Sequence, residues 1–393
     1  MIPQARLEGI DEKAVRQLLG IAREGRTLDF KEALDLSDAG RRALAEDVCA
    51  FANTIGGDLV FGIREQGGVA EDIVPVELQN PDTALLQLTN ALRDMVEPRV
   101  TTTLRSHVVR LAGGGHVIVL RVGLSPNAPH RVLRNNHFYL RNSVGKETMD
   151  IQAIRTAFAF ADSLADRALA VRDRRLETLN AGGSPRPLKL APLVAVHIVP
   201  LLALTRRSAH PVEALKACAR HLTAATAARG NPLRTAEVNY EGVICPADRD
   251  AEDRVGGYAQ LFRDGCIELV GCLTTHPLPG EGDRFTALYP SQYELPLVHE
   301  ALPAILETFA ALDVPPPAYL FLSLLHLPNA LRIGFQLPLE YARFPPVPAH
   351  LSQIISAPVY VEDFGQQPLE MIRPVLDPVW NAVGEEHTQT QFR

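Results

Sequence analysis

Six side chains between residues 130 and 146 are of types that bind phosphates and bases. Arginine forms bidentate hydrogen bonds to phosphate, and an exposed tyrosine can stack on an unpaired base. Phe138 and Leu140 alternate with the tyrosine and one of the arginines, so we expect them on the opposite, core-facing side of a strand. The predicted contacts to nucleic acid are His130, Arg131, Arg134, Tyr139, Arg141 and Lys146.

The charge of the chain is uneven, and these residues lie in its basic part. The 393 residues carry a formal net charge of −7. Residues 101–190 hold 14 basic and 6 acidic side chains, a balance of +8, whereas the segments on both sides are acidic. The middle of the chain therefore predicts a local basic surface for a polyanion, although a basic segment is also consistent with a simple solvated face.

Several common catalytic motifs are missing. Gly145-Lys146 is followed by Glu147, and Leu140 stands where a phosphate-binding loop would begin with glycine. The patterns GxGxxG, HExxH and GxSxG do not occur. These absences argue against a Walker-type nucleotidase, a Rossmann dehydrogenase, a zincin and a serine hydrolase.

Hydrophobic spacing and turn residues predict a mixed α/β first half. Ser37 or Asp38 can cap a helix that Gly56-Gly57 would end. Gly113–Gly115 would join two strands of a hairpin. The expected helices are 12–24, 38–54, 83–96 and 150–180, and the expected strands are 28–33, 58–63, 101–111, 116–123 and 137–141.

The second half also mixes helices and strands. Asp264-Gly265 between alternating runs predicts a hairpin over 258–272. The other expected strands are 193–199 and 318–325, and the other expected helices are 212–226, 299–312 and 368–383. The segment 181–189 has linker composition and divides the chain into domains 1–180 and 190–393. The absence of an export signal and of cysteine pairs at CxxC spacing predicts free thiols, no zinc site and a cytoplasmic location.

A string of short motifs in the first half resembles the Schlafen AlbA-type domain. It runs from Glu24-x-x-x-x-Asp29-Phe30-Lys31 through the segment 50–57 (AFANTIGG) and the strand ending at Ile63 to Pro129-His130 and 139–141 (YLR). The resemblance covers about residues 10–160, and nothing comparable is recognised over 190–393. It implies a Schlafen-core-like α/β domain associated with nucleic-acid binding.

The resemblance also implies three carboxylates that support metal-dependent cleavage of structured RNA in some family members. Carried over by position, they are Glu24, Asp29 and Glu65, which would be both catalytic groups and ligands of Mg²⁺ or Mn²⁺. Asp29 is shorter than the usual glutamate of the family, and Arg64 replaces one of its usual acids. Lys31 shares a strand face with Asp29 and could offset its charge or bind a phosphate.

A purely structural interpretation exists for several of these residues. Exposed charged residues are common near the ends of helices and strands, and this alone could explain Glu24, Asp29 and Glu65. Asn53 and the two following glycines are typical of a helix end that turns closely into a strand, and the alternative is a backbone-lined anion site.

The leading hypothesis is an RNA-directed protein that acts as a metal-dependent endoribonuclease on structured RNA such as tRNA, without a membrane partner. Domain 190–393 would regulate it or sense an unknown partner, and a homodimer would rebuild a two-lobed basic valley from two copies. The alternatives are a non-catalytic nucleic-acid-binding regulator and a nucleotide-binding protein.

Overall fold

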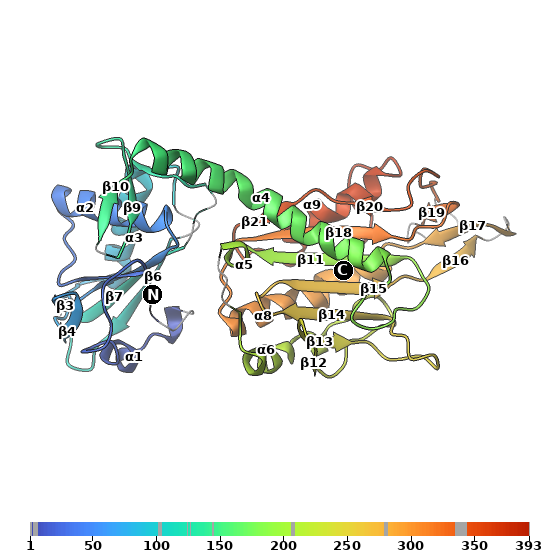
Figure 1. Cartoon of the computed structure of the whole chain (residues 1–393), viewed down its shortest axis with the longest axis horizontal. Coiled ribbons are helices and arrows are strands. Elements are labelled where there is room, and N and C mark those ends of the chain that lie inside the picture. The colour runs from blue at the N-terminus through green and yellow to red at the C-terminus, as the bar shows by residue number, and fades with distance from the viewer. Residues whose placement is uncertain are drawn as a thin grey trace. The chain divides into compact units, whose positions relative to one another are not determined.

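The computed structural model describes residues 2, 7–100, 104–123, 125, 127–143, 145–205, 209–278, 282–334 and 344–392. The chain forms two compact units, Met1–Leu164 (unit 1) and Ala165–Arg393 (unit 2), which we describe separately. Both units mix helices with sheets (Figure 1), which confirms the expected α/β class. No helix among the described residues is long and apolar enough to cross a membrane.

The main sheet of unit 1 has the strand order β1-β2-β7-β6. Strand β1 pairs in parallel with β2, and the other two pairings are antiparallel. The bounds are β1 Leu28–Lys31, β2 Gly57–Phe61, β6 Leu104–Arg110 and β7 His116–Val122. Strand β6 belongs to the strand expected over 101–111, whose residues 101–103 lie outside the described part of the chain.

Helix α2, Asp38–Ala52, is the crossover between the parallel strands β1 and β2. Ser37 caps it, as expected, by accepting a hydrogen bond from the Gly40 N–H. Phe51 and the last turn of α2 pack with β2 and β7 in the same apolar core. A Cβ atom at Gly57 would lie 2.2 Å from the Phe51 ring, so only glycine permits this close turn into β2.

A second antiparallel sheet, ordered β10-β9-β8-β5, packs on α2. Its strands are β5 Val96–Glu97, β8 Arg131–Val132, β9 His137–Arg141 and β10 Lys146–Thr148. A separate hairpin consists of β3 Ile63–Gln66 and β4 Val69–Ile73. The remaining helices of unit 1 are η1 Leu7–Gly9, α1 Glu12–Arg16 and α3 Pro81–Met95.

Helix α4, Ile151–Asn180, has the length expected from the sequence, but the two units divide inside it. The sequence places the boundary at 181–189, after the helix. Leu176 and Leu179 lie in an apolar cluster with residues of the unit 2 sheet. This packing explains why the last half of the helix belongs to unit 2.

Unit 2 is built on an eight-stranded sheet with the order β12-β13-β14-β15-β11-β18-β20, in which β21 also pairs with β18. The expected hairpin at Asp264-Gly265 is present between β14 and β15. The sheet strands are β11 Leu193–Pro200, β12 Glu237–Val238, β13 Gly242–Pro246, β14 Gly257–Phe262, β15 Ile267–Cys272, β18 Ala318–Leu325, β20 Ile354–Ile355 and β21 Val359–Val361.

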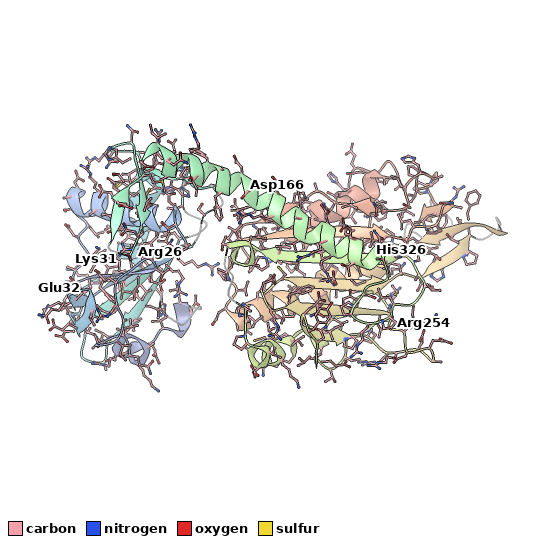
Figure 2. All side chains as sticks on the ribbon, in the orientation of Figure 1. Arg26, Lys31, Glu32, Asp166, Arg254 and His326 are labelled. Carbon is pink, nitrogen blue, oxygen red and sulfur yellow. The ribbon has the colours of Figure 1, made fainter. Side chains whose placement is uncertain are left out.

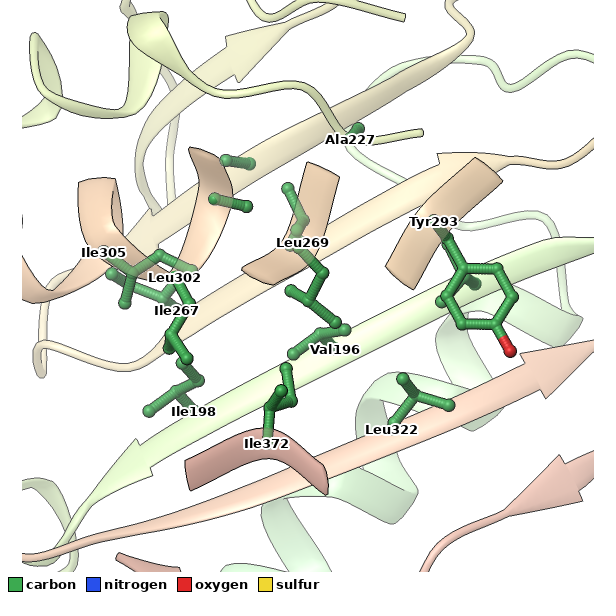
Figure 3. Close-up of a cluster of buried hydrophobic side chains, with 14 of the residues drawn as sticks. Val196, Ile198, Ala227, Ile267, Leu269, Tyr293, Leu302, Ile305, Leu322 and Ile372 are labelled. Atoms are coloured by element: carbon green, nitrogen blue, oxygen red, sulfur yellow. The ribbon is translucent and has the colours of Figure 1, made fainter. Parts of the chain in front are cut away.

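Helices cover this sheet and bury its apolar side chains. Figure 3 shows Val196 and Leu269 from neighbouring strands packed with side chains such as Ile305 and Ile372. A small sheet contains β16 Thr275–Leu278, β17 Gly282–Leu288 and β19 Leu331–Ile333. The helices are α5 Leu201–Thr205, α6 Val212–Ala219, η2 Leu222–Ala224, α7 Ser291–Pro296, η3 Leu297–Ala301, α8 Leu302–Leu312 and α9 Pro368–Asn381.

Candidate nucleic-acid interface

The motif residues of the first half meet at the carboxyl end of α2. The Asn53 side chain accepts a hydrogen bond from the His130 N–H and donates to the carbonyl oxygens of His130 and Tyr139, at 2.6, 2.8 and 2.9 Å. Thr54 Oγ1 accepts from the Arg141 N–H at 3.0 Å. The AFANTIGG segment therefore fastens α2 to β8 and β9, in agreement with the structural interpretation of Asn53.

His130 is buried beside this cross-link. Its Nδ1 lies 2.6 Å from the Pro98 carbonyl oxygen, a distance at which the ring donates a hydrogen bond there. Burial lowers the pKa of the ring, which favours the neutral form. His130 is therefore too buried to make the predicted phosphate contact. Its ring instead links the segment at Pro98 to the start of β8.

Strand β9 has the opposite orientation from the one expected. Tyr139 and Arg141 are buried, while Phe138 and Leu140 are only partly buried. Tyr139 is part of the apolar core of unit 1 and its hydroxyl accepts a hydrogen bond from Asn135. Neither Tyr139 nor Arg141 presents the free face that stacking on a base or holding a phosphate would require.

Arg141 forms a buried ion pair with Asp29. The guanidinium lies 2.6 Å from Asp29 Oδ1, donates to the Gly25 carbonyl oxygen at 2.7 Å and rests over the Phe51 ring. Lys31 Nζ lies 2.7 Å from the other oxygen, Asp29 Oδ2. Burial would raise the pKa of Asp29, but these two cations outweigh it and lower that pKa.

The three carboxylates predicted as metal ligands lie in one region. Glu24 accepts a hydrogen bond from the Phe30 N–H at 2.9 Å, next to Asp29. The Glu24 N–H donates to the Gly68 carbonyl oxygen, which places this segment beside the β3–β4 turn and Glu65. Burial raises the pKa of Glu24, and the charges of Asp29 and Glu65 add to this effect.

These carboxylates do not fit a divalent cation. Both oxygens of Asp29 face a cationic side chain, and Glu65 Oε2 accepts a hydrogen bond from the Gly68 N–H at 2.5 Å. Among the described residues, no group of three or more histidine, cysteine, aspartate or glutamate side chains is placed to hold a metal ion. Mg²⁺ and Mn²⁺ need several oxygens that are free to point at one ion.

The remaining predicted contacts are cations that are partly or fully exposed, and two of them lie against the same side chain of α2. Lys31 and Lys146 both lie near the carboxylate of Asp47, at 3.5 and 3.0 Å. Lys146 also donates to the Ala43 carbonyl oxygen. Arg134 lies 3.6 Å from Asp38 in the first turn of the same helix, and Arg131 pairs with Glu97 at 2.6 Å.

The sequence reasoning missed further cations of unit 1, among them Arg23, Arg26 and Arg41. Arg23 and Arg26 flank Glu24 and are exposed, and Figure 2 shows Arg26 in the same part of unit 1 as Lys31. Arg41 lies on α2. The side chains of these three arginines make no hydrogen bond or ion pair that we find among the described residues. The sequence does contain a clue to these cations. Arg23 and Arg26 lie next to the motif residue Glu24, and Arg41 lies in the first turn after the Ser37 cap.

Comparison with known proteins agrees with the motif resemblance. The family model for the Schlafen AlbA_2 domain matches residues 24–150, so unit 1 contains a Schlafen AlbA-type domain, a type of domain that points to nucleic-acid binding. No curated protein matches this chain.

Two solved structures are similar over short stretches. The DIP2311 protein of Corynebacterium diphtheriae is 19% identical, with 35% of this chain and 29% of that chain covered and a TM-score of 0.26. The N-terminal domain of a RecG-related protein of Nitrosomonas europaea, described by its relation to an ATP-dependent DNA helicase, is 22% identical, with 26% of this chain and 65% of that chain covered and a TM-score of 0.21. The chain thus spans less than two thirds of either structure.

Proposed function

We propose that this protein binds nucleic acid through the cations along α2 of its Schlafen AlbA-type domain, which are partly or fully exposed, and acts without cutting it. We call these cations, Lys31, Arg41, Arg42, Arg134 and Lys146, the α2 surface. The observation that carries the proposal is the pairing of Asp29 with Lys31 and Arg141, which turns the central carboxylate of the family pattern into part of a buried ion pair.

The acids of the α2 surface do not prevent binding. Arg42 and Lys146 pair with Glu46 at 3.3 Å each, and Arg134 pairs with Asp38. The Arg134–Asp38 pair is exposed, and exposed ion pairs contribute only about 0–1 kcal/mol, so exchanging Asp38 for a phosphate costs little there. Each phosphate that replaces a carboxylate also releases counterions from the nucleic acid, which favours binding at low salt.

Metal-dependent RNA cleavage is the second candidate function, favoured by one observation. Glu24 lies within electrostatic reach of both Asp29 and Glu65, so the three acids of the family pattern do gather in one region. The pairing of Asp29 with Lys31 and Arg141 argues against cleavage, because it occupies both carboxylate oxygens. The two candidates differ in what they require of an added metal ion.

A tRNA pool separates the two candidates. The full chain should shift the tRNA in a native gel equally with Mn²⁺ and with chelator, and leave it intact. Lys146→Ala should weaken binding and reduce the slope of log K against log salt by about 0.7–0.9. Arg16→Ala, which removes an exposed arginine paired with Glu12 on α1, is the matched control and should leave binding unchanged.

Two results would overturn the proposal. Discrete tRNA fragments that form with Mn²⁺, disappear with chelator and are lost in Glu24→Gln would establish cleavage. A wild-type chain that shifts no tRNA at low salt would remove nucleic-acid binding altogether.

A further inference from the structure

A pocket of about 470 Å³ opens at the amino end of α2, and neither the sequence motifs nor the family match assigns it a role. Pockets of about 300–1,000 Å³ hold small molecules. Three elements form it: the first turn of α2, the last turn of α3 and the loop after β8. Its lining residues are Asp38, Arg41, Ala91, Asp94, Met95, Leu133 and Arg134.

The pocket combines an apolar wall with two guanidinium groups and two carboxylates, those of Asp38 and Asp94. Ala91, Met95 and Leu133 provide the apolar part, and Leu133 is 41% exposed. The Leu133 N–H donates to the Met95 carbonyl oxygen at 2.9 Å, which fixes the loop against the end of α3. The wall is therefore held in place before any ligand arrives.

Arg41 is the unpartnered cation of this pocket. Its Nε atom is buried, and we find no hydrogen-bond partner for it among the described residues. A buried guanidinium nitrogen without an acceptor is costly, and an anion that supplies the acceptor recovers that cost. Arg134, on the other side, forms the exposed pair with Asp38 at 3.6 Å, and we find no other ion pair for it in the described part of the chain.

We propose that this pocket takes one unpaired nucleotide of the bound strand, with the base against Leu133 and Met95 and the phosphate on Arg41 and Arg134. A base has an apolar face that packs on such a wall, and arginine binds phosphate with paired hydrogen bonds. Asp94 can accept from an exocyclic amino group of the base, as acidic side chains do with cytosine.

The position of the pocket links it to the α2 surface. Asp38 and Arg41 line the pocket, and Lys146 reaches Ala43 and Asp47 further along the same helix. Asp38 and Asp47 are about 13 Å apart along the helix axis at 1.5 Å per residue. A strand whose phosphates follow α2 therefore brings a neighbouring nucleotide to the pocket. This inference rests on the proposed function.

The test compares two RNA hairpins, each closed by a non-nucleotide linker, that differ by one bulged nucleotide, with binding of the full chain followed by fluorescence anisotropy. The wild-type chain should bind the bulged hairpin more tightly. Leu133→Ala should weaken that binding about tenfold, because it removes apolar surface that packs on the base, while leaving the fully paired hairpin unaffected. Arg41→Ala should weaken it similarly and also reduce the salt slope by about 0.7–0.9.

The matched controls are Leu86→Ala and Arg105→Ala. Leu86 is a 62% exposed leucine of α3 that does not line the pocket, and Arg105 is an exposed arginine of β6. Both should bind the two hairpins as the wild type does. Circular dichroism of every variant checks that the fold is retained.

The outcomes separate the pocket from the proposed function. If Lys146→Ala weakens binding but Leu133→Ala binds the bulged hairpin as the wild type does, the α2 surface binds nucleic acid and the pocket inference is wrong. Equal wild-type affinity for the two hairpins also contradicts the pocket. If the wild-type chain binds neither hairpin, the proposed function fails and the pocket fails with it.

Discussion

Arg141 and Asp29 are 112 residues apart in the sequence, and their side chains meet inside unit 1 with 2.6 Å between Nη2 and Oδ1. The same guanidinium donates to the backbone carbonyl oxygens of Gly25 and Leu28. The Arg141 side chain therefore ties β9 to the start of β1, although these two strands belong to different sheets.

Removing Arg141 should destabilise unit 1 strongly. In Arg141→Met, Asp29 stays buried with only Lys31 beside it, and breaking a buried ion pair from one side typically costs about 3–5 kcal/mol. Hydrogen exchange of peptides from β1 and β9 in the full chain measures this loss. Arg131→Met, which breaks the exposed pair with Glu97, should cost less than about 1 kcal/mol. Equal losses in the two variants would contradict a structural role of Arg141.

The stability of unit 1 should depend on pH through Asp29. The pKa of Asp29 is lowered in the folded chain from its ordinary value of 3.8. Its contribution to stability is therefore complete above that value and is lost as the pH falls through the lower, folded pKa. The loss of exchange protection caused by Asp29→Asn should be constant from about pH 5 upward and shrink below about pH 4. If the difference in exchange protection between the wild type and Asp29→Asn does not change with pH, the negative charge of Asp29 is not what stabilises unit 1.

Divalent metal ions should not stabilise the protein. Lys31 and Arg141 already face both oxygens of Asp29, so an added cation would have to displace a positive charge. The thermal midpoint of unfolding should be the same in millimolar Mn²⁺ and in chelator. A midpoint that rises with Mn²⁺ in the wild type, and fails to rise in Glu24→Gln, would show that the carboxylates do hold a metal ion.

The sequence predicted the elements of unit 1 better than the roles of their side chains. Ser37 and Gly57 mark the two ends of the α2 crossover segment because a cap and a close turn are local features. The face of β9 was predicted wrongly, because alternation separates two faces without telling which one meets the core. Phe138 and Tyr139 are both large aromatic residues, and only the position of α2 decides that Tyr139 is the buried one.

The same limit applies to the charged residues. Nothing in the spacing of Asp29 and Arg141 indicates that they pair, since the contact depends on how two sheets pack around α2. The pocket at Arg41 was missed for a similar reason. Its three elements come from separate parts of the sequence, and no motif connects them.

A buried polar cluster in unit 2 centres on Glu268. Glu268 on β15 accepts hydrogen bonds from Arg175 of α4, at 2.9 and 2.8 Å, and from the Tyr258 hydroxyl at 2.8 Å. His197 Nε2 lies 2.9 Å from the same carboxylate. The cluster therefore anchors the last turns of α4 to three neighbouring strands of the sheet, β14, β15 and β11.

The fluorescence of Trp380 should report how changes in this cluster affect the stability of unit 2. Trp380 is the single tryptophan of the chain and is buried in unit 2. Glu268→Gln removes the buried carboxylate that Arg175, Tyr258 and His197 share, although Arg175 keeps its pair with Glu241 at 3.0 Å, and should cost about 3–5 kcal/mol. Tyr258→Phe removes one hydrogen bond to a charged acceptor and should cost about 1.5–3 kcal/mol. Urea unfolding followed by tryptophan fluorescence gives both values. Glu307→Gln, which changes an exposed carboxylate paired with His221, is the control and should stay within about 0.5 kcal/mol.

The cluster should also make unit 2 sensitive to acid. Burial would raise the pKa of Glu268, but the hydrogen bonds from Arg175 and His197 outweigh it and lower that pKa to about 2, from an ordinary value of 4.5. Because the folded pKa is the lower one, the stabilisation is complete above 4.5 and is lost between 4.5 and about 2 as the pH falls. The wild type should therefore lose more stability than Glu268→Gln over this interval. Parallel losses in the two chains would show that Glu268 does not carry the buried charge that this cluster requires.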